Sequence, residues 1–169
     1  LSRAIHLIPQ TMHTYRAAGM DLDGFLLLAE LGDELLNLNR FQTTHLIFEQ
    51  ALLRAPHRYP CWGKARVLEA MVSCLEQMGD PGAGAETAKE ASAALEDLDF
   101  PAEAAWLQVR QARLRFALNE REAAMDLLRR AGERFQTLEA WDQATEVQEI
   151  LHGWGKWHPA ADAERRSRR

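Results

Sequence analysis

Few side chains in this sequence have the type and spacing that catalysis or metal binding requires. His6 and His13 stand about two helical turns apart, but Pro9 lies between them and no carboxylate completes a ligand set. We therefore interpret the histidines as surface or internally hydrogen-bonded residues. Cys61 and Cys74 form no CxxC motif, and Cys74 has no histidine or basic activator near it in the sequence. The sequence predicts no catalytic residue, no metal site and no cofactor.

Phosphate-binding signals are equally weak. The segment Gly82-Ala83-Gly84 follows Asp80-Pro81 at an expected helix start, and it has neither a lysine nor a preceding strand. The basic run ERRSRR near the C-terminal end could contact phosphates, but we favour a solvated end. A nucleotide-binding loop is therefore not indicated.

Composition and charge narrow the class of protein. The chain has 169 residues, is 47% hydrophobic and has a mean hydropathy of −0.35, which is typical of a folded soluble protein. Without the four arginines of the last five residues, 16 basic side chains face 25 acidic ones, which makes nucleic-acid binding unlikely. No apolar run approaches the roughly 18 residues of a membrane span. The cysteine pattern favours a reducing cytoplasm. Because the chain begins with Leu1, we expect a processed product or a piece of a longer polypeptide.

The elements that must position any site are predicted to be helices. Between Phe25 and Pro56 two amphipathic stripes are joined by a short polar turn around Asn39. The stripes are formed by Leu28, Leu31, Leu35 and Leu38, and by Phe41, Thr44, Phe48, Ala51 and Leu52. Pro56 is expected to stop the second helix. This pattern predicts one helical hairpin, which cannot bury both of its apolar faces alone.

Further hairpins are expected at about 62–98 and 102–136, followed by a last helix at about 138–152. Gly79 is predicted to end a helix, and Asp80-Pro81 to cap and begin the next. Asn119 and Glu122 resemble a capping-box variant at the start of a further helix. No segment shows sustained alternation with a period of two, so no sheet is expected.

A repeat of 40 residues relates the hairpins. The series Gly32, Val72, Ala112, the series Ala51, Ala91, Ala131 and the series Phe48, Ala88, Leu128 each keep this interval. The pattern Leu28, Leu31-Gly32, Leu35, Phe41, Thr44, Phe48, Ala51, Pro56 resembles the tetratricopeptide repeat (TPR) family, in a long-period variant similar to the repeat regions of large bacterial signalling proteins. In the third repeat Gln108, Gln111 and Arg115 occupy positions that are normally apolar.

This resemblance implies an all-α fold, a right-handed α–α superhelix of antiparallel helix hairpins with a C-terminal capping helix. It implies a TPR-like repeat domain over residues 1–155, with a partial repeat at 1–20, repeats at 25–58, 65–98 and 105–137, and a capping helix at 138–152. Residues 156–169 would form a polar, arginine-rich and disordered tail.

In the family, the first helix of each repeat lines a concave groove. The resemblance then places in the groove the binding candidates Asp33, Asn37, Arg66, Glu69, Ser73, Glu76, Trp106, Val109, Arg113 and Phe116, together with Leu26, Ala29 and Leu36. Trp106 and Phe116 would anchor a partner peptide, unless they belong to the core. Co-chaperone members clamp an acidic peptide end with Lys and Asn, whereas this chain has Ala29, Asp33, Glu69 and Ser73 there, so that activity is not expected.

Two functions follow as hypotheses. The first is a non-catalytic scaffold that binds a protein or peptide segment, basic or apolar, or another domain of its own parent chain. The alternative is a ligand-sensing regulatory domain of a larger bacterial transcription activator or signalling enzyme. A homodimer through the apolar third repeat is possible under either hypothesis. We expect no membrane partner.

Overall fold

The computed structural model describes residue 8, residues 10–11, 13–15, 17–55 and 61–155, and this part of the chain is all-α without a strand. The described residues between 8 and 17 are helical. The helices that follow are α2 (Asp21–Asn37), α3 (Phe41–Leu52), α4 (Trp62–Met78), α5 (Pro81–Glu96), α6 (Pro101–Ala117), α7 (Arg121–Thr137) and α8 (Trp141–Gly155). The expectations for Pro56, His6, Pro9 and the tail at 156–169 lie outside the described residues.

Residues with a left-handed backbone end the first described helix and helices α2, α4, α5, α6 and α7, at intervals that are multiples of 20 residues. They are Gly19, Asn39, Gly79, Asp99, Asn119 and Glu139. Helix α3 ends instead with Leu53 in the right-handed helical region. At each of the six left-handed positions, the amide of the next residue donates to a carbonyl five residues earlier. Examples are Arg40 N to Leu35 O (2.9 Å) and Asp80 N to Leu75 O (3.0 Å). This is the Schellman pattern, which satisfies carbonyls that a helix end leaves free. The 40-residue repeat therefore consists of two similar halves.

The predicted starts of α5 and α7 have different outcomes, since one is confirmed and the other is wrong. Asp80 accepts from Ala83 N (3.0 Å) and caps α5, as expected. Asn119 does not open a helix: its φ of +66° ends α6, and α7 begins after Glu120 without a side-chain cap. The last helix begins at Trp141 and ends at Gly155, three residues later at each end than the predicted range of about 138–152.

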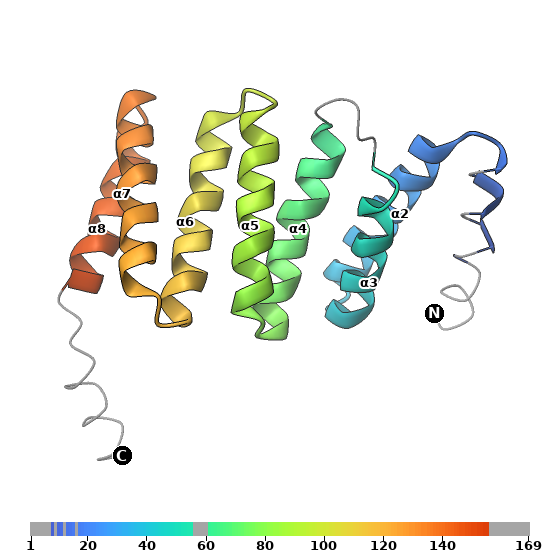
Figure 1. Cartoon of the computed structure of the whole chain (residues 1–169), viewed down its shortest axis with the longest axis horizontal. Helices are drawn as coiled ribbons and strands as arrows, with labels where there is room; N and C mark the ends of the chain where they lie inside the picture. The colour runs from blue at the N-terminus through green and yellow to red at the C-terminus, as the bar shows by residue number, and fades with distance from the viewer. Residues whose placement is uncertain (1–7, 9, 12, 16, 56–60, 156–169) are drawn as a thin grey trace, which may run out of the picture.

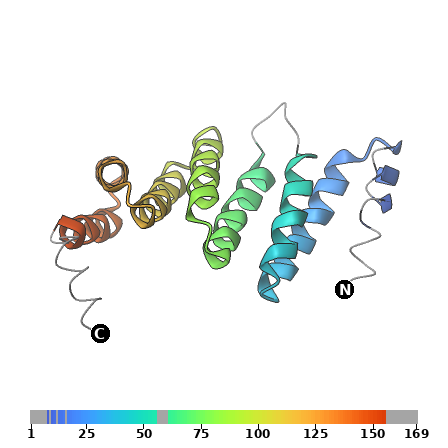
Figure 2. The same cartoon turned by 60° about the horizontal axis from the view of Figure 1, so that its bottom comes forward.

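The helices follow one another along the length of the molecule, with α2 and α8 toward opposite ends (Figures 1 and 2). Each helix packs mainly on the helices before and after it in the chain. The packing forms two layers, and we name α2, α4, α6 and α8 the inner layer and α3, α5 and α7 the outer layer. Such a stack is a solenoid, in which each unit depends on its neighbours.

The core is a series of separate clusters without a shared centre. One cluster joins α2, α3 and α4 around Phe25, Phe48 and Leu75. Smaller clusters join α4, α5 and α6, and a last one joins α6, α7 and α8 around Leu128 and Phe135. This arrangement leaves one long face on each layer available for contacts.

The interval of 40 also relates large and small core residues. A Cβ at Gly32 would lie 2.1 Å from Cε1 of Phe48, so only glycine fits beside that ring. At the positions of Gly32 and Phe48, the second repeat has Val72 and Ala88, which share one buried cluster. The third repeat has Ala112 and Leu128. A larger side chain on one helix of a pair is therefore matched by a smaller one on the other helix. This explains how Val72 fits where the TPR pattern has glycine.

Candidate functional site

The inner layer carries most of the residues that the sequence marked as binding candidates. Asp33 and Asn37 are exposed on α2, Arg66 and Glu76 on α4, and Arg113 on α6. Glu69 and Ser73 are half-buried on α4. These side chains lie on one face because they recur every three or four residues along their helices.

Hydrogen bonds and ion pairs link these residues within and between the helices of the inner layer. Arg66 Nη1 donates to Glu69 Oε2 at 2.6 Å within α4. Arg110 Nη2 bridges from α6 to α4, where it donates to Glu76 Oε2 at 2.7 Å and to Ser73 Oγ at 3.0 Å. We name this set the inner strip; its members are Asp33, Arg66, Glu69, Ser73, Glu76, Arg110, Arg113 and Glu146.

Arg110 and Glu146 were missed by the sequence reasoning. Arg113 on α6 pairs with Glu146 on α8 at 3.5 Å, so the strip reaches the last helix. The repeat could have found Glu146, which stands 40 residues after the candidate Trp106, but not Arg110, because its equivalent Ala70 was not a candidate. Their arginine partners also change the charge of the face: Glu69, Glu76 and Glu146 are each paired with an arginine and are not free carboxylates.

Asp33 lies where its surroundings disfavour the charged carboxylate. Burial raises the pKa of its carboxyl, and Glu34 adds to that effect, while the charge of Arg66 on the neighbouring helix opposes it. The interaction with Arg66 places Asp33 next to the α4 part of the strip.

The three remaining candidates on α6 belong wholly or partly to the core. Val109 is 0% exposed, so its assignment to the groove lining is corrected: it packs in the cluster of α6, α7 and α8. Trp106 is half-buried against Phe135, with ring centroids 5.4 Å apart. Phe116 is half-buried and stacks on Trp154 of α8, with ring centroids 4.1 Å apart. Both rings contribute to helix packing, because a wide apolar face needs cover on more than one side.

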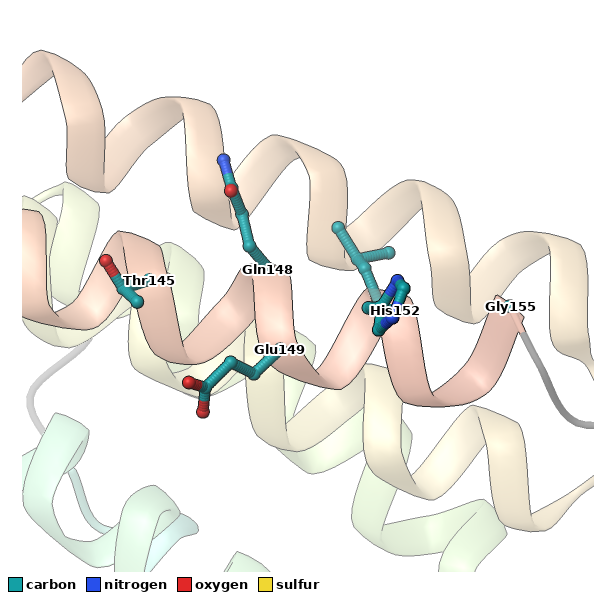
Figure 3. A pocket seen from close by; sticks show the side chains of 6 residues that line it. Thr145, Gln148, Glu149, His152 and Gly155 are labelled. Carbon is teal, nitrogen blue, oxygen red and sulfur yellow. The ribbon is translucent and has the colours of Figure 1, made fainter.

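The last helix presents a polar face. A hollow of about 760 Å³ lies along α8, and the side chains of Thr145, Gln148, Glu149 and His152 project from the helix there (Figure 3). Leu151 and Gly155 complete its lining. A polar outer face on a terminal helix is the usual property of a repeat that caps a solenoid.

The described part of the chain offers little for other kinds of site. Among these residues no group of three or more His, Cys, Asp or Glu side chains could hold a metal ion. Cys74 is fully buried, donates to Phe41 O at 2.9 Å, and burial raises the pKa of its thiol. Within the same residues, no helix has the length and apolarity to cross a membrane.

Comparison with known proteins supports the fold. No protein-family model matches this chain, and no curated protein does. Among solved structures it is similar to the type III secretion translocator chaperone SycD from Yersinia enterocolitica, with a TM-score of 0.60 and 15% sequence identity. The match covers 82% of this chain and 96% of SycD. The chain therefore has the predicted fold, a TPR-like superhelix of antiparallel helix pairs.

Proposed function

We propose that this chain is a non-catalytic helical-repeat scaffold that binds a segment of another protein along its inner layer. The observation that carries the proposal is an apolar region beside the inner strip. Leu22 and Leu26 of α2 are exposed, the latter by 46%, and their spacing puts them on the face of Asp33. Trp62, one helical turn before Arg66 on α4, is also exposed.

This combination suits a peptide better than a small molecule. The exposed leucines and Trp62 offer apolar anchors, and the inner strip offers donors and acceptors along the same layer. Stacked helix hairpins form long surfaces of this kind, on which an extended or helical segment can lie.

The structural comparison agrees with a protein partner. SycD is described as a chaperone of secretion translocators, and it shares the superhelical fold over most of its length. At this level of identity the likeness supports the architecture, and the binding role is our inference from the exposed face.

The partner we propose is apolar rather than basic. The sequence suggested a basic partner because Asp33, Glu69 and Glu76 are acidic, but Arg66 and Arg110 already pair with Glu69 and Glu76. A basic peptide would have to displace these arginines, which removes much of its electrostatic gain.

A selection experiment with matched variants tests the proposal. Peptides of random sequence are displayed on phage, selected on the immobilised chain, and measured by calorimetry. Leu26→Asp should weaken binding of the selected peptides by tenfold or more. Leu46→Asp is the control, because Leu46 is 59% exposed on α3, in the outer layer. Circular dichroism checks that both variants fold.

The result would contradict the proposal if no peptide is enriched, or if Leu46→Asp weakens binding as much as Leu26→Asp does. We avoid Trp106→Ala as a test, because the packing of Trp106 on Phe135 would mix a loss of stability with a loss of binding.

A further inference from the structure

Helix α6 turns a polar face toward the outer layer. An inner-layer helix such as α6 has one face that lies between two outer-layer helices. We name this face the outer seam. On α6 it contains Gln108, Gln111 and Arg115, the same residues that depart from the apolar repeat pattern. Gln108 Nε2 donates to Glu96 Oε1 of α5 at 3.2 Å. Arg115 pairs with Glu86 of α5 and with Glu120.

Gln111 differs from the other two. Only 6% of this residue is exposed, and its amide forms no hydrogen bond within the described residues. Its polar atoms still reach the surface, because no buried side-chain nitrogen or oxygen in the described residues lacks a hydrogen-bond partner. An amide without a protein partner is therefore left to bind water or a ligand. The equivalent residue 40 positions earlier is Met71, which is buried in an apolar cluster.

The Gln111 side chain borders a cavity. A hollow of about 270 Å³ lies between α5, α6 and α7, and Gln108 and Gln111 line it from α6. Lys89 and Ser92 line it from α5, and Leu127 and Arg130 line it from α7. Its size is slightly below the usual range for ligand sites, so only a small molecule would fit.

The charges around the cavity favour an anion. Neither Lys89 nor Arg130 forms an ion pair with any of the described residues. The carboxylate at the rim, Glu96, is already paired with Arg134 of α7. The hydroxyl of Ser92 donates to Ala104 O at 3.0 Å, and no hydrogen bond joins it to Gln111.

We propose that this cavity binds a small carboxylate. Arg130 and Lys89 supply the positive charge, and the Gln111 amide donates a hydrogen bond to one carboxylate oxygen. A guanidinium matches the two oxygens of a carboxylate well. The site lies on the outer layer and is independent of the proposed peptide-binding face.

The place of the cavity in the fold disfavours phosphate. Phosphate sites commonly use free backbone amides at a helix N-terminus. Here every lining residue lies beyond the first turn of α5, α6 or α7, where backbone amides are already engaged in helical hydrogen bonds. The donors are therefore side chains alone.

The test is a titration of the full chain with succinate, followed by NMR at the side-chain amide of Gln111. The signal is assigned by its loss in the Gln111→Met variant. Inorganic phosphate and sodium chloride at equal ionic strength serve as reference anions. Succinate should shift the Gln111 amide saturably, and phosphate and chloride should not.

Variants on α7 provide a matched pair. Arg130→Met should raise the dissociation constant of succinate by roughly tenfold or more, because one charge-assisted contact is lost. Arg129→Met is the control, since Arg129 is exposed and pairs with Asp126, away from the cavity. Gln111→Met, followed at the backbone amides around the cavity, should weaken binding similarly.

Three results would overturn the proposal. They are a shift of the Gln111 amide that does not saturate, an equal response to phosphate or chloride, and an equal loss in Arg129→Met and Arg130→Met. Each would mean that the cavity has no specific site for a carboxylate.

Discussion

The outer seams of α4 and α6 occupy equivalent places in consecutive repeats, yet they have opposite chemistry. The seam of α4 presents Leu68, Met71 and Leu75, all buried. At an interval of 40 residues the seam of α6 presents Gln108, Gln111 and Arg115. The helices have the same length and similar neighbours, so the backbone does not require apolar residues there. A repeat sets the position of a side chain and leaves its chemistry free to change.

The polar seam is tolerated because its two ends are paired. Gln108 meets Glu96 at one end, and Arg115 meets Glu86 and Glu120 at the other. The hydrogen bond with Glu120 is the main reason that the pKa of Arg115 is raised, and the charge of Glu86 adds to it. Only Gln111, in the middle, lacks a partner in the described structure. This one residue separates a structural explanation of the seam from a ligand-binding one.

The largest expected change in stability comes from placing an arginine, as at Arg115 of α6, at the equivalent position Leu75 of the α4 seam. Leu75→Arg should lower the free energy of unfolding by about 4 kcal/mol or more, because it removes a buried Leu and introduces a charge without a partner. Urea denaturation measures the change. The reverse substitution, Arg115→Leu, should cost less than about 1 kcal/mol. Similar losses for both would mean that the two seams are not equivalent environments.

The next effect is smaller, because the substitution keeps the side-chain volume. Met71→Gln should destabilise the protein by about 2 kcal/mol, since the α4 cluster has no partner for an amide. The midpoint and slope of a urea titration measure it, and an unchanged slope shows that the unfolded state is unaltered. A loss below about 0.5 kcal/mol would show that water reaches the α4 seam.

Replacing the α6 glutamine with the α4 methionine should stabilise the protein, in contrast to Met71→Gln. Gln111→Met should raise the free energy of unfolding by roughly 0.5–1 kcal/mol, because it replaces an unpaired amide with an apolar side chain of similar size. The gain is limited because the amide faces a cavity that water can enter. Destabilisation by this variant would mean that the amide has a hydrogen bond in solution that holds α6 in place.

The sequence predicts the helices of this protein better than it predicts the contacts of the candidate site. The helix pairs could be predicted from the spacing of apolar residues. In a solenoid each apolar stripe packs on helices that are adjacent in the sequence, so the local pattern is sufficient. Asn119 was misassigned, since a left-handed residue that ends one helix and a cap that opens the next have similar composition. Val109 was placed in the groove because its spacing fits both the inner face and the core.

The contacts across the inner layer could not be predicted from one helix at a time. Arg110 lies near Glu76 only because α4 and α6 both pack on α5, and the two residues are 34 positions apart in sequence. The sequence did mark Gln108, Gln111 and Arg115 as departures from the repeat. That Gln108 and Gln111 line a cavity depends on where α5 and α7 lie, which no local pattern contains.

A weaker prediction concerns the paired end of the α6 seam. Glu86→Gln should reduce stability by only about 0.5 kcal/mol, because the pair is exposed and Arg115 keeps Glu120 as a partner. The loss should shrink as salt is raised, because the interaction is screened. Thermal unfolding at low and high ionic strength measures it. A salt-independent loss would indicate that Glu86 contributes through packing rather than charge.

The smallest expected effect contrasts Asp33 on the inner layer with the paired charges of the α6 seam. Burial raises the pKa of Asp33 above its ordinary value of 3.8, so the native state binds a proton more readily than the unfolded state. Stability from this group is therefore present at low pH and declines as the pH rises through the raised pKa. The D33N variant should be more stable than the original chain at pH 7, by less than about 0.5 kcal/mol because the side chain is exposed. The difference should vanish near pH 3, where both forms are neutral at this position, and urea midpoints at the two pH values measure it. If D33N is less stable at pH 7, attraction by Arg66 outweighs burial, and Asp33 belongs with the paired charges after all.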